Sequence, residues 1–88
     1  MNVGFIDDEL KIFPNPGSGL FYITGFYKDK WAGYIEVFNA IGKRIDVRLK
    51  LLDNGGEIDL MDQPNGIYFV KFRDENEYFF KNLIICRI

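Results

Sequence analysis

The stretch that decides the fold is residues 12–23, IFPNPGSGLFYI. Two prolines and two glycines fall within residues 14–19, and no helix accommodates this combination, because each proline fixes φ and removes a backbone donor. The apolar and aromatic residues on both sides favour short strands. We therefore predict a rigid turn at residues 14–19, hereafter the corner, which joins strands at residues 10–13 and 19–24.

Size and composition indicate one folded domain. The chain has 88 residues, of which 48% are hydrophobic and 17% aromatic, whereas disordered chains are poor in aromatic residues and carry a high net charge. The nine Phe, five Tyr and one Trp are expected to form the core together with branched aliphatic residues. The net charge is −2 with basic and acidic residues interspersed, which argues against the basic surface of a nucleic-acid-binding protein.

Glycine, proline, Asn and Asp divide the chain into short runs rich in Ile, Val, Phe and Tyr. This spacing is typical of an all-β sandwich or barrel, and no helical period lasts for more than a turn. Asn39 and Gly42 are placed for a tight hairpin, with Gly42 in the left-handed conformation. The seven predicted strands are residues 10–13, 19–24, 34–39, 43–51, 57–60, 67–73 and 77–86.

Alternation of apolar and charged residues assigns the faces of the middle strands. In residues 43–51 the apolar side chains alternate with arginine, lysine and aspartate, so one side of the strand is expected inside and the other outside. The last strand does not alternate cleanly, and its faces are not assigned. The residues predicted to point inward are Ile35, Val37, Ile45, Val47, Leu49, Ile58, Leu60, Tyr68, Val70 and Phe72.

The residue types present exclude several kinds of active site. The chain has no histidine, which rules out Ser-His-Asp and Cys-His catalysis and every metal site that includes histidine. Cys86 is the single cysteine, so no internal disulfide forms, and we expect a small buried or edge hydrophobe there. The carboxylates, Asp59 and Asp62 among them, form no evident catalytic pair and lack the spacing of a calcium loop. We predict no enzyme activity, no cofactor and no metal site.

Residues 1–9 are expected to be a linker or leader ahead of a sandwich domain at residues 10–88. They contain the acidic run Asp7, Asp8 and Glu9, which favours a solvated segment. They lack the positive region and the long apolar region of a secretory signal. The apolar runs elsewhere are too short for a membrane helix, so no membrane insertion is expected.

An aromatic loop at residues 25–33, GFYKDKWAG, leaves two interpretations open. Trp31, with Tyr27 and Tyr34 nearby, could form a stacking platform for a sugar, which would make the chain a carbohydrate- or surface-binding module. The ring of Trp31 could instead fold back over one end of the sandwich. The second interpretation is favoured, because small domains need their large aromatic side chains for the core.

The order of four motifs along the chain is more specific than any one of them. The motifs are LKIFPNPGSGLFYI at residues 10–23, IEVFNAIGKRI at 35–45, IDLMDQPNGIYFVKF at 58–72 and FKNLIICR at 80–87. This series resembles the type A carboxy-terminal sorting domain of proteins exported by the type IX secretion system, also called the Por secretion system. The resemblance implies an immunoglobulin-like antiparallel β-sandwich of about seven strands, in agreement with the strand pattern. The residues that match the family motifs are Pro14, Asn15, Pro16, Asn39, Gly42, Asn65, Gly66 and Tyr68.

The resemblance also implies a function that needs no active site. Such a domain directs the cargo protein joined to its amino terminus through the outer membrane of a Gram-negative bacterium, after the cargo has reached the periplasm by a separate signal. The implied partners are outer-membrane proteins of the secretion system and a sortase-like protease, which cuts ahead of the domain, here in or before residues 1–9. The cargo is then secreted or anchored at the cell surface.

Basic residues near the tail are the expected contacts with this machinery. Lys71 follows the third motif, and Lys81 and Arg87 bracket the apolar tail, as the resemblance implies. We expect these three cations to be exposed and to be recognised with the tail strand, because a sheet edge and projecting charges can be bound without a pocket. For the corner, an architectural role and direct recognition both stay open.

Overall fold

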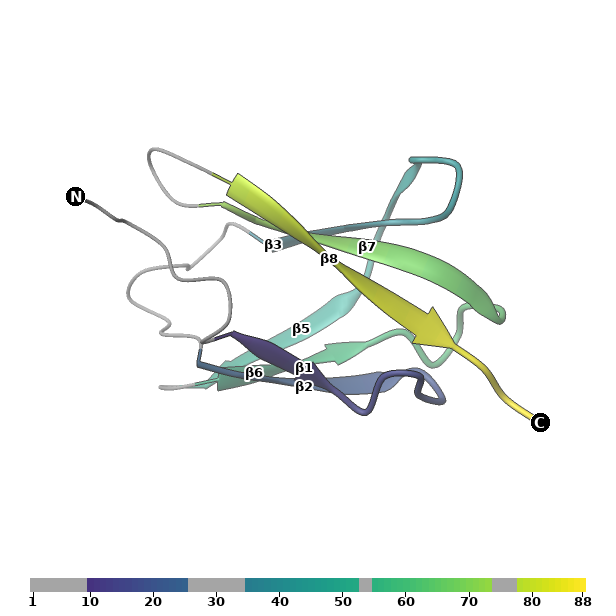
Figure 1. Ribbon diagram of the computed structural model, residues 1–88, viewed down its shortest axis with the longest axis horizontal. Coiled ribbons are helices and arrows are strands. Elements are labelled where there is room, and N and C mark those ends of the chain that lie inside the picture. Colours follow the sequence, from purple (N-terminus) through teal and green to yellow (C-terminus); the bar gives the residue numbers. More distant parts are fainter. Residues whose placement is uncertain (1–9, 26–34, 53–54, 74–77) are drawn as a thin grey trace.

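The computed structural model describes residues 10–25, 35–52, 55–73 and 78–88 as two antiparallel sheets packed face to face, with no helix among these residues (Figure 1). This confirms the predicted all-β sandwich. The strands are β1 (Lys11–Phe13), β2 (Leu20–Thr24), β3 (Ile35–Phe38), β4 (Arg44–Ile45), β5 (Arg48–Leu52), β6 (Gly55–Asp59), β7 (Gly66–Arg73) and β8 (Tyr78–Ile85).

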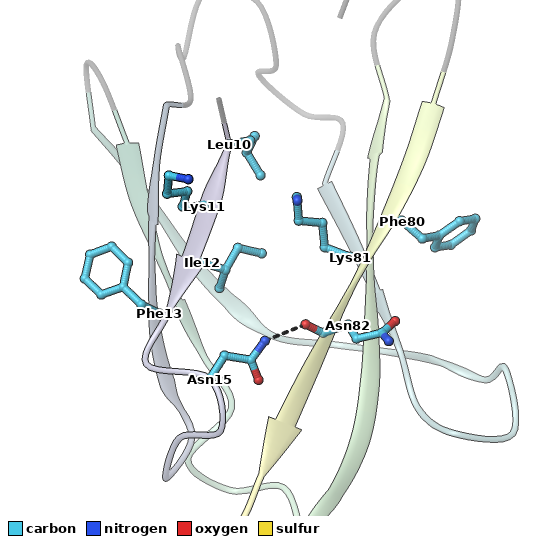
Figure 2. Close-up of a pocket in the computed structure, with 8 residues that line it drawn as sticks. All are labelled: Leu10, Lys11, Ile12, Phe13, Asn15, Phe80, Lys81 and Asn82. Atoms are coloured by element: carbon cyan, nitrogen blue, oxygen red, sulfur yellow. Dashed lines mark hydrogen bonds between the residues drawn. The ribbon is translucent and has the colours of Figure 1, made fainter. Parts of the chain in front are cut away.

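Each sheet has four strands. The first sheet has the order β1-β2-β6-β5 and the second the order β4-β3-β7-β8. The β7–β8 hairpin is the longest pairing, and its register runs from Gly66 opposite Ile85 to Arg73 opposite Tyr78. β1 and β8 are therefore both edge strands, and they lie beside each other on one side of the sandwich (Figure 2).

The core lies between the two sheets and is apolar. None of the described residues that are buried is polar or charged. Ile45 and Val47 are partly buried and pack against the core, and the other inward predictions except Leu49 are confirmed as buried. The buried hydrophobic residues are Leu10, Phe21, Ile23, Ile35, Val37, Ile58, Leu60, Tyr68, Val70, Phe72, Leu83 and Ile85.

The predicted strand at residues 43–51 is wrong as a single strand. It is divided into β4, which pairs with β3, and β5, which pairs with β6 in the other sheet. The chain crosses between the sheets at residues 46–47, and because both sheets share one interior, inward alternation continues across the crossing. Leu49 lies opposite Ile58, but β5 is the edge of its sheet, and 37% of Leu49 stays exposed.

The hairpin between β3 and β4 has the predicted geometry. The Asn39 carboxamide oxygen accepts from the backbone N–H of Ile41 (3.1 Å) and of Lys43 (2.9 Å). The Gly42 N–H donates to the Asn39 carbonyl at 2.9 Å. Gly42 has φ of +85°, a left-handed conformation that glycine adopts without steric cost. The Asn39 side chain and Gly42 thus form the turn together.

Candidate functional site

The Asn15 side chain joins the corner to β8. Its Nδ2 donates to the Asn82 carbonyl at 2.8 Å, and its Oδ1 accepts from the Ile84 N–H at 3.0 Å; the first bond is drawn in Figure 2. One carboxamide has one donating and one accepting end, as a peptide unit has. Asn15 therefore takes the place that a neighbouring strand would occupy along the edge of β8.

Gly17 continues this contact with its backbone. Its N–H donates to the Ile84 carbonyl, and its carbonyl accepts from the Cys86 N–H, both at 2.9 Å, in a parallel bridge to Ile85. A Cβ on Gly17 would lie 2.6 Å from the Pro14 carbonyl oxygen, so no larger residue fits without movement. The peptide bonds before Pro14 and Pro16 are both cis. The corner thus connects one sheet to the edge of the other.

The Arg87 guanidinium joins two loops to the tail: the corner and the loop between β6 and β7. Nε donates to the Ser18 carbonyl (2.7 Å) and Nη1 to the Gln63 carbonyl (2.6 Å). Nη2 donates to the carbonyls of Met61 (3.1 Å) and Leu60 (3.3 Å). The planar guanidinium suits this arrangement, because it presents several N–H donors in a fixed fork.

Gly19 leaves room for this guanidinium. A Cβ at Gly19 would lie 2.8 Å from Arg87 Nη2, and Gly19 has φ of +132°, which side-chain-bearing residues rarely adopt. Glycine is therefore required at position 19 for two reasons: it has no Cβ to contact the guanidinium, and it tolerates the positive φ. The second glycine of the corner is as specific to its place as Gly17 is.

Asn65 and Tyr68 hold the same end of the molecule. The Asn65 carboxamide accepts from the Arg87 backbone N–H (3.0 Å) and donates to the Arg87 carbonyl (3.1 Å). The Tyr68 hydroxyl donates to the Pro64 carbonyl at 2.6 Å. Burial raises the pKa of Tyr68, and the positive charge of Arg87 partly opposes this rise. Gly66 lies between them and begins β7.

The four sequence motifs meet at one end of the sandwich, on the right in Figure 1. The hairpin at Asn39 adjoins the third motif across a shallow pocket of about 230 Å³, which Asn65, Gly66 and Tyr68 also line. Arg87 connects the third motif to the corner. Hydrogen bonds thus join the corner, the third motif and the tail, and with the adjoining hairpin they form one end of the molecule, hereafter the motif end.

The three cations predicted for recognition do not form one surface. Each is partly buried rather than exposed. The Lys71 amine lies 4.7 Å from the centroid of the Tyr78 ring on the outer face of its sheet. Lys81 is paired with the buried Val70, and its side chain extends toward β1 (Figure 2). Arg87 belongs to the motif end.

The remaining site predictions have different outcomes. Tyr27, Trp31 and Tyr34 lie outside the described residues, as do residues 1–9, so the sugar platform and the leader stay predictions. Cys86 is exposed and directly follows the edge strand β8, so of the two predicted positions, buried or at an edge, the edge position is the one observed.

Two kinds of feature are absent from the described part of the chain. Within residues 10–25, 35–52, 55–73 and 78–88, no group of three or more His, Cys, Asp or Glu side chains could hold a metal ion. In the same ranges no helix has the length and apolar character needed to span a membrane.

Sequence reasoning missed the hydrogen bonds between the motifs. The local pattern places Asn15 in a turn, but its partners lie 67 and 69 residues away, where no local pattern points to them. One signal was present: Asn15 is the only polar side chain in the run FPNPG. A lone carboxamide between two prolines, which have no N–H of their own, is placed to bond outside its own turn.

Comparison with known families agrees with the motif order. A family model described as a secretion system C-terminal sorting domain matches residues 11–86, which is nearly the whole chain. No curated protein matches the chain significantly.

Proposed function

The chain belongs to the family of secretion system C-terminal sorting domains, and from this membership we propose that the closed sandwich, not a linear peptide, is what the secretion machinery recognises. The family is a non-catalytic signal of the type IX system and implies translocation of a cargo across the outer membrane. The cargo of such domains is secreted or displayed on the cell surface of Bacteroidetes-type bacteria.

The motif end carries this proposal. Three residues are central to it: Asn15 and Asn65, which match the sequence motifs, and Arg87, which flanks the tail. The side chain of each forms hydrogen bonds to backbone atoms of distant segments. Such residues hold the sandwich closed, whereas a peptide signal would present its polar groups to the partner. Recognition therefore depends on the folded shape that the motifs stabilise, and Arg87 contributes through that shape.

The partners proposed are outer-membrane proteins of the secretion system and a sortase-like protease. The tail strand, with Lys71 and Lys81, is the proposed contact with the first. The protease cuts in or before residues 1–9, because an acidic linker is accessible to a protease, and the cargo is then released or joined to an anionic lipopolysaccharide. The assignment to type A rests on the motif pattern alone.

An export assay tests the proposal. The whole chain is fused to the carboxy terminus of a fluorescent protein that carries a periplasmic signal peptide, in a cell with the type IX machinery. Fluorescence is measured in the medium, on the surface and in the periplasm, and a strain without the translocon is the control. We expect translocon-dependent export, with the new carboxy terminus of the cargo within or before residues 1–9 by mass spectrometry. Retention of the folded fusion in the periplasm would contradict the proposal.

A further inference from the structure

Asn65 and Gly66 are each required by the folded structure, and side by side they make a chemically labile pair. The Asn65 carboxamide bonds both backbone groups of Arg87, which takes one accepting and one donating end. Gly66 has φ of +155°, which glycine adopts without steric cost. Asparagine is among the chemically labile residues, and it deamidates most readily before glycine, because glycine has no side chain to shield its N–H from the asparagine side chain.

Deamidation of this pair needs water and no other reactant. The Gly66 backbone nitrogen attacks Cγ of Asn65, an N–Cγ bond forms, and the side-chain nitrogen leaves as ammonia with the proton that Gly66 gives up. The product is a cyclic imide, which water then opens. Cleavage of the new bond gives aspartate at position 65, and cleavage of the original peptide bond gives isoaspartate, in which the main chain runs through Cγ.

The closed sandwich engages both reacting groups elsewhere. The Asn65 side chain is bonded at both ends to Arg87. Ile84 directs both its backbone groups at the corner, so by alternation the groups of Ile85 face β7. There Ile85 is paired with Gly66, whose N–H is therefore directed at β8. Asn65 and Gly66 are both exposed, so hydrogen bonding, and not exclusion of water, is what opposes the reaction.

Among the described asparagines, Asn65 alone precedes a glycine. Asn15 precedes a proline, which has no N–H to attack with, and Asn39 and Asn82 precede residues whose side chains hinder the approach. The chain has a second Asn-Gly pair at residues 54–55, of which Asn54 lies outside the described residues. In the unfolded chain this second pair is a chemical reference for the first.

The products of deamidation do not fit the motif end. In aspartate an oxygen replaces the nitrogen that donates to the Arg87 carbonyl, and an ionised carboxylate has no proton to donate. Isoaspartate adds a main-chain atom ahead of Gly66, which displaces Gly66 from its pairing with Ile85. Either product therefore weakens the contact between the third motif and the tail.

We propose that Asn65–Gly66 is a site of spontaneous deamidation, which the closed sandwich protects and whose products weaken its closure. A chain that folds soon after synthesis keeps Asn65, whereas a chain that stays open accumulates aspartate and isoaspartate at this position. The chemistry is independent of the sorting function. Its consequence for export, a signal that is lost from chains that fold late, rests on that function.

Peptide mass spectrometry of the purified whole chain tests the protection. The chain is kept at pH 8 in buffer and in unfolding urea, and both products at position 65 are followed over time after chromatographic separation. We expect Asn65 to react at least ten times more slowly in buffer than in urea, and the reaction of Asn54 in urea is the positive control. Equal rates at Asn65 in urea and in buffer, with the chain folded in buffer by circular dichroism, would overturn the proposal. So would an Asn65 that does not react in urea while Asn54 does.

Refolding of the aged chain tests the effect of isoaspartate. Chains partly deamidated in urea are returned to buffer and treated with a protease, and the resistant fraction is mapped by the same method. We expect isoaspartate at position 65 to be at least ten times rarer in the resistant fraction than in the aged chain before digestion. An equal share of isoaspartate in both would overturn the proposal.

The variant Asn65→Asp tests the effect of the other product. Asn82→Asp is the matched control, because it makes the same change from amide to acid at an exposed position and keeps the carbonyl that Asn15 binds. We expect Asn65→Asp to unfold at a lower urea concentration than the parent chain does, and Asn82→Asp to unfold at the same concentration as the parent. An Asn65→Asp variant as stable as the parent would overturn the proposal. None of these measurements uses export, so they decide the proposal even if the parent fusion is not exported and the sorting function fails.

Discussion

Asn15 shows how one side chain can stand in for a strand. Replacing it with alanine leaves the Asn82 carbonyl and the Ile84 N–H without their present partner. We expect Asn15→Ala to lower the free energy of unfolding by about 1–3 kcal/mol, measured by urea unfolding. Ser18→Ala is the control, because Ser18 contributes its backbone carbonyl to Arg87 and alanine keeps that carbonyl. Equal stability of the two variants would contradict the role given to Asn15.

Substitution of Arg87 distinguishes a structural role of this residue from direct recognition by the secretion machinery. Lysine keeps the charge, but its single nitrogen cannot reach the four backbone carbonyls of two loops that the guanidinium binds. We expect Arg87→Lys to lower the free energy of unfolding by about 2–4 kcal/mol, with export reduced only as far as the folded fraction is. The measurement is urea unfolding beside the export assay. An Arg87→Lys variant of normal stability that is not exported would make Arg87 a direct contact of the machinery.

The buried Tyr68 side chain is expected to make the folded chain less stable at alkaline pH. Burial raises its pKa in the folded chain above the ordinary value of 10.0, so ionisation favours the unfolded state. Its contribution is fully present below pH 10 and is lost as the pH rises from there through the folded pKa. We expect Tyr68→Phe to melt at a lower temperature at pH 8, because the bond to Pro64 is lost, but to decline less above pH 10. If the melting temperatures of the parent chain and of Tyr68→Phe fell in parallel between pH 8 and 12, this assignment would be contradicted.

At the scale of elements, the corner is a stiff connection between β1 and β2. Each proline limits the conformations of the unfolded chain, and this limit is worth about 0.4–1 kcal/mol where the folded backbone suits proline. We expect the double variant Pro14→Ala and Pro16→Ala to lose a few kcal/mol of stability at most and to lose export in proportion. Lost export at an unchanged melting temperature would show that the machinery touches the corner itself.

Most strands could be predicted because turn residues bound them. Asn39 and Gly42 fixed one hairpin, and the prolines and glycines of the corner fixed another. The division between β4 and β5 could not be predicted, because the inward alternation does not change where the chain passes from one sheet to the other. The faces of β8 could not be assigned from the sequence because both carry apolar residues. Leu83 and Ile85 are buried, while Phe80 and Ile84 on the opposite face stay 49% and 38% exposed.

At the scale of the whole molecule, the motif residues could be identified from their order, but their partners could not. Asn65 binds Arg87 across 22 residues, and Asn15 reaches further, so their contacts exist only in the folded sandwich. Lys71 and Lys81 suggested one basic surface because both precede or follow apolar runs. The register of β7 and β8 instead places them on opposite faces of the sheet.

The closure of the sandwich predicts the effect of truncation. A chain that stops at Lys81 lacks the buried Leu83 and Ile85 and every contact of Arg87. We expect this chain to be unfolded by circular dichroism and quickly cleaved by a protease. A chain that lacks only Ile88, which is fully exposed, should fold as the parent does. A protease-resistant chain ending at Lys81 would contradict the closure described here.

The bonds from Asn15 and Arg87 between the corner and the tail also determine when the domain can fold during its synthesis. They join residues 67 and 69 positions apart, and chains with such distant contacts fold slowly. Ribosomes add residues in order, so the corner is synthesised early and waits for its partners until β8 has followed. During this delay the chain is still open, which is compatible with the passage of the inner membrane that the proposed function requires. Under that proposal, the outer-membrane machinery can recognise the domain only after β8 has been synthesised and the sandwich has folded.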